Sequence, residues 1–405
     1  MKSLLDLEQF ISAYVTRRKE SLLTTDLKIR KDELQEKIGG KSVLVIGGAG
    51  TIGSSYIKAL LRYKPSKLVV VDINENGLTE LVRDCRSRND ISLPKNFISY
   101  PINFGDKVFD KIFRQEGPFD IVANFAAHKH VRSEKDIFSI EAMIDNNVLR
   151  AKQLLDTLLR QPPQRFFCVS TDKAANPVNI MGASKKLMEE VILAYSGQIR
   201  IATARFANVA FSNGSLPAGF IERIMKKQPF SSPSDVRRYF VSPIESGEIC
   251  LLACMIGNSG EIIFPKLDPE KDLVNFADIA KAFLTYIGFE PDICKTEDEA
   301  RAKAAVIGTG SNSYPLYLFE SETSGEKLFE EFYTEAEDLE LDRFHALGVI
   351  KNAFRREQQE LDGIIKEIEV MFKKDTTKED LVQLLNKMLP TFRHIEKNKN
   401  LDQHM

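Results

Sequence analysis

From Lys41 to Phe206 the sequence repeats one pattern, in which a short apolar run is followed by a longer amphipathic segment. Short runs without polar alternation are typical of strands buried on both faces, and the intervening segments have the spacing of helices. Strands that alternate with helices in this way form a parallel sheet covered on both faces. The pattern predicts an α/β fold with a doubly wound parallel sheet and strands at 43–46, 68–71, 97–102, 121–125, 166–169 and 201–206.

The segments on either side differ from this pattern. Residues 1–40 carry apolar positions at helical spacing, which predicts an N-terminal helical extension. Within 208–350 prolines and glycines are frequent, and we interpret this region, including the apolar run 262–264, mainly as a smaller substrate-binding lobe. Residues 351–405 are charged and helical in pattern, which predicts a C-terminal helical extension. The expected nucleotide-binding domain is therefore 41–207.

A glycine-rich loop follows the first predicted strand and precedes an amphipathic segment. Glycines at this spacing let the backbone approach a pyrophosphate at the positive end of a helix. Asp72 follows the second predicted strand, where a carboxylate can accept hydrogen bonds from both ribose hydroxyls and repels a 2′-phosphate. The two signals predict NAD rather than NADP. The expected cofactor contacts are Gly47, Gly50, Thr51, Ile52, Gly53, Asp72, Asn103, Ala126 and Lys185.

Polar residues that carry chemistry follow the predicted strand 166–169. Thr171, Asp172 and Lys173 lie at its carboxyl end, which in a doubly wound sheet faces the ligand crevice. Met181 and Lys185 are four positions apart and share one face of the next predicted helix. A lysine serves as a base only if its pKa is lowered, and an aspartate as an acid only if its pKa is raised. We expect their surroundings to tune Asp172 and Lys173 in these directions.

Five motifs occur in order along 41–348, roughly three quarters of the chain. They are Asn124-Phe125-Ala126-Ala127-His128-Lys129-His130-Val131, Ser170-Thr171-Asp172-Lys173, Met181-Gly182-Ala183-Ser184-Lys185, Arg205-Phe206-Ala207-Asn208-Val209 and Gly325-Glu326-Lys327-Leu328. In this order they resemble the UDP-N-acetylglucosamine 4,6-dehydratases, the polysaccharide-biosynthesis branch of the extended short-chain dehydrogenases. The resemblance implies a Rossmann domain over 41–207 and a UDP-sugar substrate. Family members usually have arginine and proline before Gly325, where this chain has Thr323 and Ser324, so that part of the nucleotide contact differs.

The resemblance implies a reaction in three steps. NAD takes hydride from C4 of the sugar, water is lost across C5 and C6, and hydride returns to C6. It assigns removal of the C5 proton to Lys173, protonation of the departing hydroxyl to Asp172 and a hydrogen bond to substrate to Thr171. Lys185 is expected to hold the nicotinamide ribose and to keep positive charge near O4.

Met181 occupies the position of the tyrosine in other members of the superfamily. A thioether does not accept a proton, so the O4 proton must pass to Lys185, Asp172 or a water. Met181 also has a purely structural interpretation, as packing beside the nicotinamide. Membrane-anchored dehydratases of this branch also have methionine here and retain the configuration at C5, whereas the small tyrosine-containing ones invert it. The resemblance implies retention.

Substrate contacts are expected from cationic and amide side chains that suit phosphate oxygens. By position in the motifs these are Lys129, Asn208 and Arg238, although each could instead be a surface or loop residue. His128 and His130 flank Lys129 without a third ligand at metal-binding spacing, so we predict no metal site.

Composition limits the other classes of function. A formal net charge of -2 argues against a general nucleic-acid binder. No window approaches the roughly 18 apolar residues of a membrane span, so we expect a cytoplasmic protein without a membrane partner. The five cysteines form no CxxC pair, which suits reduced thiols, and Cys250 and Cys254 are expected in the core. The amphipathic terminal helices favour self-association, so we expect a homo-oligomer.

Two other functions remain possible from the sequence. A UDP-sugar 4-epimerase would also oxidise C4, but it needs no C5 base, which Lys173 would otherwise supply. A non-catalytic nucleotide-sensing protein would explain the missing tyrosine and the extra helical ends.

Overall fold

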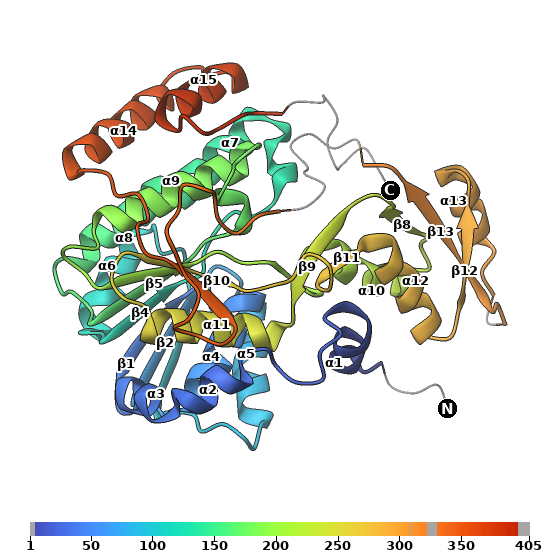
Figure 1. Cartoon of the computed structure of the whole chain (residues 1–405), viewed down its shortest axis with the longest axis horizontal. Helices are drawn as coiled ribbons and strands as arrows, with labels where there is room; N and C mark the ends of the chain where they lie inside the picture. The colour runs from blue at the N-terminus through green and yellow to red at the C-terminus, as the bar shows by residue number, and fades with distance from the viewer. Residues whose placement is uncertain (1–4, 309, 322–329, 396–405) are drawn as a thin grey trace.

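The computed structural model describes residues 5–308, 310–321 and 330–395. Among these residues the main body is a nine-stranded sheet with helices on both faces (Figure 1). Strands β3-β2-β1-β4-β5-β6-β10 are parallel in this order, and β15 and β14 extend the β10 edge as antiparallel strands. The predicted doubly wound sheet is confirmed. Its strands are β1 (Ser42–Ile46), β2 (Lys67–Asp72), β3 (Asn96–Pro101), β4 (Ile121–Asn124), β5 (Arg165–Val169), β6 (Ile201–Ala204), β10 (Glu261–Pro265), β14 (Leu339–Glu340) and β15 (Leu347–Ile350).

Each face of the sheet has its own apolar core, because alternate side chains of these strands point to opposite faces. One face is covered by α2 (Thr24–Ile29), α3 (Lys31–Ile38), α4 (Thr51–Leu61), α5 (Glu75–Ser87) and α11 (Pro243–Ile256). The other is covered by α6 (Lys107–Glu116), α7 (Ile137–Ile144), η3 (Asp145–Leu149), α8 (Arg150–Leu158) and α9 (Ile180–Ala194). Two short 3₁₀ turns, η2 (Val131–Lys135) and η4 (Asp172–Ala174), lie in loops that follow β4 and β5.

A smaller lobe lies beside the sheet and has a third, aromatic-rich core. Its elements are α10 (Leu216–Lys226), α12 (Phe276–Tyr286), α13 (Glu297–Ala305) and the sheet of β12 (Glu290–Cys294), β13 (Ser313–Phe319) and β8 (Phe230–Pro233). A second sheet of β11 (Leu273–Asn275), β9 (Arg237–Val241) and β7 (Asn208–Val209) joins this lobe to the main body (Figure 1).

The boundary expected for the smaller lobe needs one correction. The apolar run 262–264 was placed in the lobe, but it lies in β10 and pairs with β6 of the main sheet. Helix α11 and strands β14 and β15, also within 208–350, pack on or join the same sheet. A short buried strand has the same apolar pattern in either sheet, so the pattern alone could not assign it.

The N-terminal extension contacts both parts. The helix α1 (Leu7–Phe10) and the π-helical turn η1 (Ile11–Val15) pack on the smaller lobe, where the Phe10 and Phe283 rings lie 5.2 Å apart. Helices α2 and α3 pack on the main sheet instead. Between them Arg18 donates hydrogen bonds to Glu245 at the start of α11 and to Asp272. The extension therefore ties the lobe to the main body.

The C-terminal helices α14 (Gln358–Met371) and α15 (Lys378–Met388) lie along the outer side of α9 (Figure 1). Their fully buried leucines and isoleucines belong to the same core as α8 and α9. As a result 13 of the 15 residues of α9 are buried. The apolar positions that suggested self-association are thus covered by the chain itself, and oligomerisation stays a prediction.

Two further expectations concern thiols and membranes. All five cysteines lie in the described residues and are free and buried, with Cys250 and Cys254 in the core as expected. Among the described residues, no helix has both the length and the apolar character needed to cross a bilayer.

Because α15 packs on the main domain, a cavity made in this helix should destabilise the protein. Leu385 is fully buried, so Leu385→Ala should lower the free energy of unfolding by about 2–4 kcal/mol in denaturant titrations. The exposed Gln383 on the same helix is the matched control, and Gln383→Ala should change stability by less than about 0.5 kcal/mol. Equal effects of the two changes would contradict the packing of α15 into the core that it shares with α8 and α9.

Candidate active site

A cleft of about 350 Å³ opens between the carboxyl ends of the parallel strands and the smaller lobe. Crevices at this edge of a doubly wound sheet are where such folds bind ligands. Polar groups converge on it from β4, β5, α9 and β9 among largely apolar walls. Of the predicted site residues it brings together Ile52, Lys129, Thr171, Lys173, Met181, Lys185, Asn208 and Arg238.

The glycine loop between β1 and α4 has the conformation that a pyrophosphate cradle requires. Gly47 has φ +75°, and a Cβ there would lie 2.5 Å from the Ala126 backbone nitrogen. A Cβ at Gly53 would lie 2.3 Å from the Gly47 carbonyl oxygen. Gly50 is the N-cap of α4, whose side-chain cap is missing, so the first amides of the helix face the loop. Any residue larger than glycine at Gly47 or Gly53 would clash with backbone atoms. The glycines leave the amides at the start of α4 open to a ligand, which fits the pyrophosphate of a dinucleotide.

Asp72 closes the same cradle from the end of β2. Its carboxylate accepts hydrogen bonds from the backbone nitrogens of Ala49 and Asn74, both at 2.9 Å. These bonds hold the carboxylate against the glycine loop, where a ribose bound over the loop would meet it.

The remaining predicted cofactor residues surround the loop. Ile52 lines the cleft, and the Thr51 hydroxyl accepts a hydrogen bond from the Asn213 nitrogen of the smaller lobe at 3.0 Å. Ala126 follows β4 and its nitrogen donates to Asn124. Asn103 follows β3, two strands from the loop, and its side chain accepts a hydrogen bond from the Gly105 nitrogen. The structure thus places all four at carboxyl ends of strands or at the start of α4.

The pair expected to exchange protons with substrate lies in η4, directly after β5. Asp172 Oδ1 accepts hydrogen bonds from the Thr171 hydroxyl at 2.8 Å, the Lys173 nitrogen at 2.9 Å and Lys173 Nζ at 3.2 Å. Thr171 and Lys173 line the cleft, and Asp172, which is 3% exposed, is hydrogen-bonded to both of them.

Glu330 is a member of this cluster that the sequence did not reveal. It lines the cleft, is 4% exposed, and its Oε1 lies 3.5 Å from Lys173 Nζ. It follows the predicted motif at 325–328, which lies outside the described residues together with Thr323 and Ser324. The adjacent Glu330-Glu331 pair offered no signal, because charged residues after a loop are usually solvated.

The charge state of Lys173 differs from the expectation. Burial alone would lower the pKa of Lys173, but the Asp172 and Glu330 carboxylates outweigh burial and hold the pKa above its ordinary value. We expected a lowered pKa, as a base requires. The sequence showed the one adjacent carboxylate but not the second, which comes from a segment far along the chain.

Met181 and Lys185 lie side by side on α9, as their spacing predicts. Both are buried and line the cleft. Lys185 Nζ donates to the Val169 carbonyl oxygen at 2.8 Å and contacts Met188 Sδ at 3.1 Å. Burial lowers the pKa of Lys185, which works against the lasting positive charge expected for this residue.

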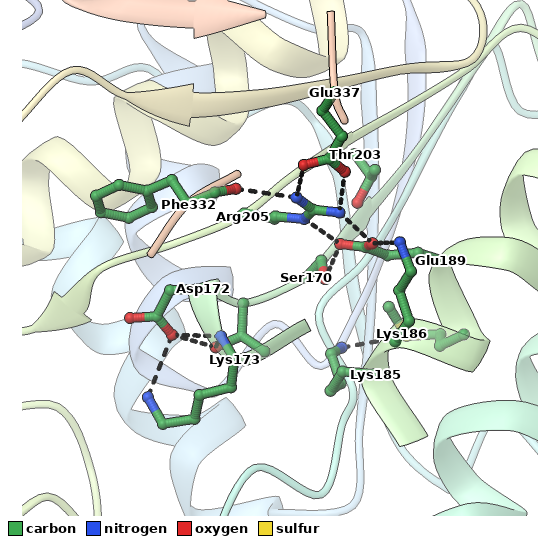
Figure 2. Close-up of polar contacts among 12 residues, drawn as sticks. Ser170, Asp172, Lys173, Lys185, Lys186, Glu189, Thr203, Arg205, Phe332 and Glu337 are labelled. Atoms are coloured by element: carbon green, nitrogen blue, oxygen red, sulfur yellow. Dashed lines mark hydrogen bonds and ion pairs between the residues drawn. The ribbon is translucent and has the colours of Figure 1, made fainter. Parts of the chain in front are cut away.

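A buried arginine holds the wall of the cleft together (Figure 2). Arg205, at the end of β6, is fully buried and donates two hydrogen bonds to Glu189 on α9 and two to Glu337. A fifth bond, of 3.0 Å, goes to the Phe332 carbonyl oxygen. Burial alone would raise the pKa of Glu189, but Arg205 keeps that pKa below its ordinary value. Glu189 also accepts a 2.6 Å hydrogen bond from Ser170, which lines the cleft.

The expected substrate contacts reach the cleft from β7, from β9 and from the loop after β4. Asn208 lines it at the start of β7, and Arg238, only 4% exposed, reaches it from β9. Lys129 lines the mouth and is exposed. Ligand-facing cations at these places suit a diphosphate. Within the described residues, no group of three His, Cys, Asp or Glu side chains is arranged to hold a metal ion.

Comparison with known proteins gives this site its context. The model of the polysaccharide biosynthesis protein family matches residues 43–352. An uncharacterised membrane protein of Methanocaldococcus jannaschii is 30% identical over 319 residues, 76% of this chain and 85% of that protein. The inverting UDP-N-acetylglucosamine 4,6-dehydratase of Campylobacter jejuni is 26% identical over 258 residues, 59% of this chain and 70% of that protein.

Some relatives are longer than this chain. The match to a probable polysaccharide biosynthesis protein of Bacillus subtilis is 25% identical and covers 73% of this chain but 48% of that protein. The chain thus spans about half the length of that relative.

Solved structures share the fold. Pen from Bacillus thuringiensis has a TM-score of 0.62 at 22% identity, over 79% of this chain and 90% of that one. A double mutant of the dTDP-glucose 4,6-dehydratase of Streptomyces venezuelae, solved with NAD bound, has a TM-score of 0.53 at 18% identity over 72% and 88%. The UDP-glucose 4-epimerase of Thermotoga maritima has 0.52 at 18% over 73% and 91%.

The family model covers well over half of the chain, including the glycine loop, the Asp172–Lys173 pair and the Arg205 cluster. The fold is that of sugar-nucleotide epimerases and dehydratases. The chain therefore belongs to the polysaccharide biosynthesis protein family.

Proposed function

We propose that this protein is an NAD-dependent 4,6-dehydratase of a UDP-sugar, with UDP-N-acetylglucosamine as the expected substrate. The observation that carries the proposal is the direct contact of Asp172 and Lys173 at the wall of a cleft that begins at the cofactor loop. Elimination of water across C5 and C6 needs one group to take the C5 proton and another to protonate the leaving hydroxyl. An amine and a carboxylate side by side meet this need. The dehydratase of Campylobacter jejuni among the relatives also supports it.

The residues around the cleft divide the work. When bound, NAD would accept hydride from C4 and return it to C6. Lys173 would remove the C5 proton, Asp172 would protonate O6, and Thr171 would hold a sugar hydroxyl. Lys129, Asn208 and Arg238 would hold the diphosphate, and the glycine loop with Asp72 would hold the cofactor.

Other members of the superfamily use a tyrosine to take the O4 proton. Counting the protons in the reaction indicates which group takes it here. Oxidation of C4 releases a proton from O4, and loss of the hydroxyl as water takes up one proton at O6. Met181 does not accept a proton. The Asp172 carboxylate takes the O4 proton and delivers it to O6, which closes the count without another group. Lys173 removes and returns the C5 proton from one face, so the configuration at C5 is retained.

Two other functions have weaker support. A 4-epimerase shares the fold, but it has no use for a lysine between two carboxylates at the cleft wall. A nucleotide sensor would explain Met181 but not the charged cluster around Lys173.

Incubation of the purified protein with UDP-N-acetylglucosamine tests the function. Mass spectrometry should show a product lighter by one water, with no added cofactor or reductant if NAD is retained. An epimer of unchanged mass would indicate the epimerase, and no conversion of any UDP-hexose would indicate the sensor.

The role of Lys173 predicts a selective loss. Lys173→Met keeps the apolar stem but has no group that accepts a proton, so dehydration should fall by about 100-fold or more while NAD binding is unchanged. Lys226→Met on α10, where the lysine side chain is 60% exposed, is the matched control. Dehydration at the normal rate in the Lys173 variant would remove this residue from the mechanism.

Asp72 predicts the choice of cofactor. The unmodified protein should bind NAD more tightly than NADP, because the carboxylate repels a 2′-phosphate. Asp72→Ala should weaken NAD binding about tenfold, measured by calorimetry. It should also reduce the difference between the affinities for NAD and NADP. The exposed Asp90→Ala serves as control. Equal affinities of the unmodified protein for the two cofactors would contradict this assignment.

A further inference from the structure

The proposed dehydration does not explain how Lys173, which lies between the Asp172 and Glu330 carboxylates, loses its proton before it acts as a base. A base must be neutral when it attacks, yet two carboxylates keep Lys173 charged in the structure. The two carboxylates are nearly closed to solvent, since Asp172 and Glu330 are 3% and 4% exposed, and the Lys173 side chain is 18% exposed. The groups nearest to Lys173 Nζ are the two carboxylates, so the acceptor of the lysine proton is sought first among them.

Asp172 is poorly suited to be that acceptor. Its Oδ1 already accepts three hydrogen bonds. In the proposed reaction Asp172 must also be ionised when it takes the O4 proton. A proton received from Lys173 would block that step.

Glu330 has the geometry that the task requires. Its Oε1 lies 3.5 Å from Lys173 Nζ, and both residues line the cleft. The position of Glu330 is fixed by the residues that follow it, because Arg205 donates hydrogen bonds to the Phe332 carbonyl oxygen and to Glu337. The charge of Arg238 on β9 also acts on Lys173: it lowers the lysine pKa and so favours release of the proton.

We propose that Glu330 takes a proton from Lys173 before elimination and returns it afterwards. The inference rests on the proposed dehydration. An Nζ–H bond breaks and an H–Oε1 bond forms, which turns an ion pair into a neutral pair without a change of net charge. The neutral lysine then takes the C5 proton and later returns it to C5. Finally Glu330 gives its proton back, so that every group ends as it began. In this role Glu330 acts on Lys173 rather than on the reacting atoms of the sugar.

The test is the pH dependence of dehydration in Glu330→Gln. The amide cannot accept the proton, so Lys173 must release it to solvent. At neutral pH the rate should fall about 100-fold, and it should rise about tenfold per pH unit toward the lysine pKa. The unmodified protein should show no such rise. KM for the UDP-sugar and the amount of bound NAD should stay unchanged.

If Glu330 acted only through its charge, the Gln variant would change the rate at neutral pH in the opposite direction. Removing an anion beside Lys173 lowers its pKa, so the Gln variant would then be as fast as the unmodified protein or faster at neutral pH. That result would overturn the inference, as would a loss of rate that does not depend on pH.

Two more variants guard against loss of the fold. Glu330→Asp keeps a carboxylate and should retain most of the neutral-pH rate, so an Asp variant with the pH profile of the Gln variant would also count against the inference. Glu331→Gln changes the exposed neighbouring residue and should leave the profile unaltered. If the unmodified protein does not dehydrate UDP-sugars at all, the proposed function fails instead.

Discussion

The cleft depends on one fully buried guanidinium. Arg205 stands at the end of β6 and bonds at once to α9 and to the segment that leads back from the smaller lobe into β14. Two carboxylates and a carbonyl oxygen satisfy its charge, which a buried arginine requires. If one partner were removed, a charge would be left buried at a cost of about 3–5 kcal/mol. The cluster therefore holds α9, with Met181 and Lys185, and the segment of Glu330 in one fixed relation.

This relation brings three charged groups together at the wall of the cleft, and they come from two distant segments of the chain. Asp172 and Lys173 come from the turn after β5, whereas Glu330 comes from a segment more than 150 residues later. Because the two carboxylates raise the pKa of Lys173, the lysine is protonated and must lose a proton before it can act as a base. The same cluster explains how a methionine at position 181 is compatible with the chemistry, because the protons can move among groups other than a tyrosine.

The sequence predicted the sheet and the position of the glycine loop well, because both follow from local patterns. Buried parallel strands are continuous apolar runs, and Gly47 and Gly53 are needed wherever a Cβ would meet backbone. The run 262–264 was misplaced, since the pattern of a buried strand does not say which sheet it joins. Glu330 and the raised pKa of Lys173 were missed because both arise from contacts between distant segments. The terminal helices were found from their periodicity, but their apolar faces pack on the same chain.

The most direct test of the central claim follows one hydrogen atom. UDP-N-acetylglucosamine labelled with deuterium at C4 should give a product that is lighter by one water and carries the deuterium at C6. NMR of the isolated product can locate the label. Such a transfer within one sugar requires a resident cofactor that takes the hydride and returns it. Deuterium found again at C4, in a sugar that has lost no water, would contradict the account.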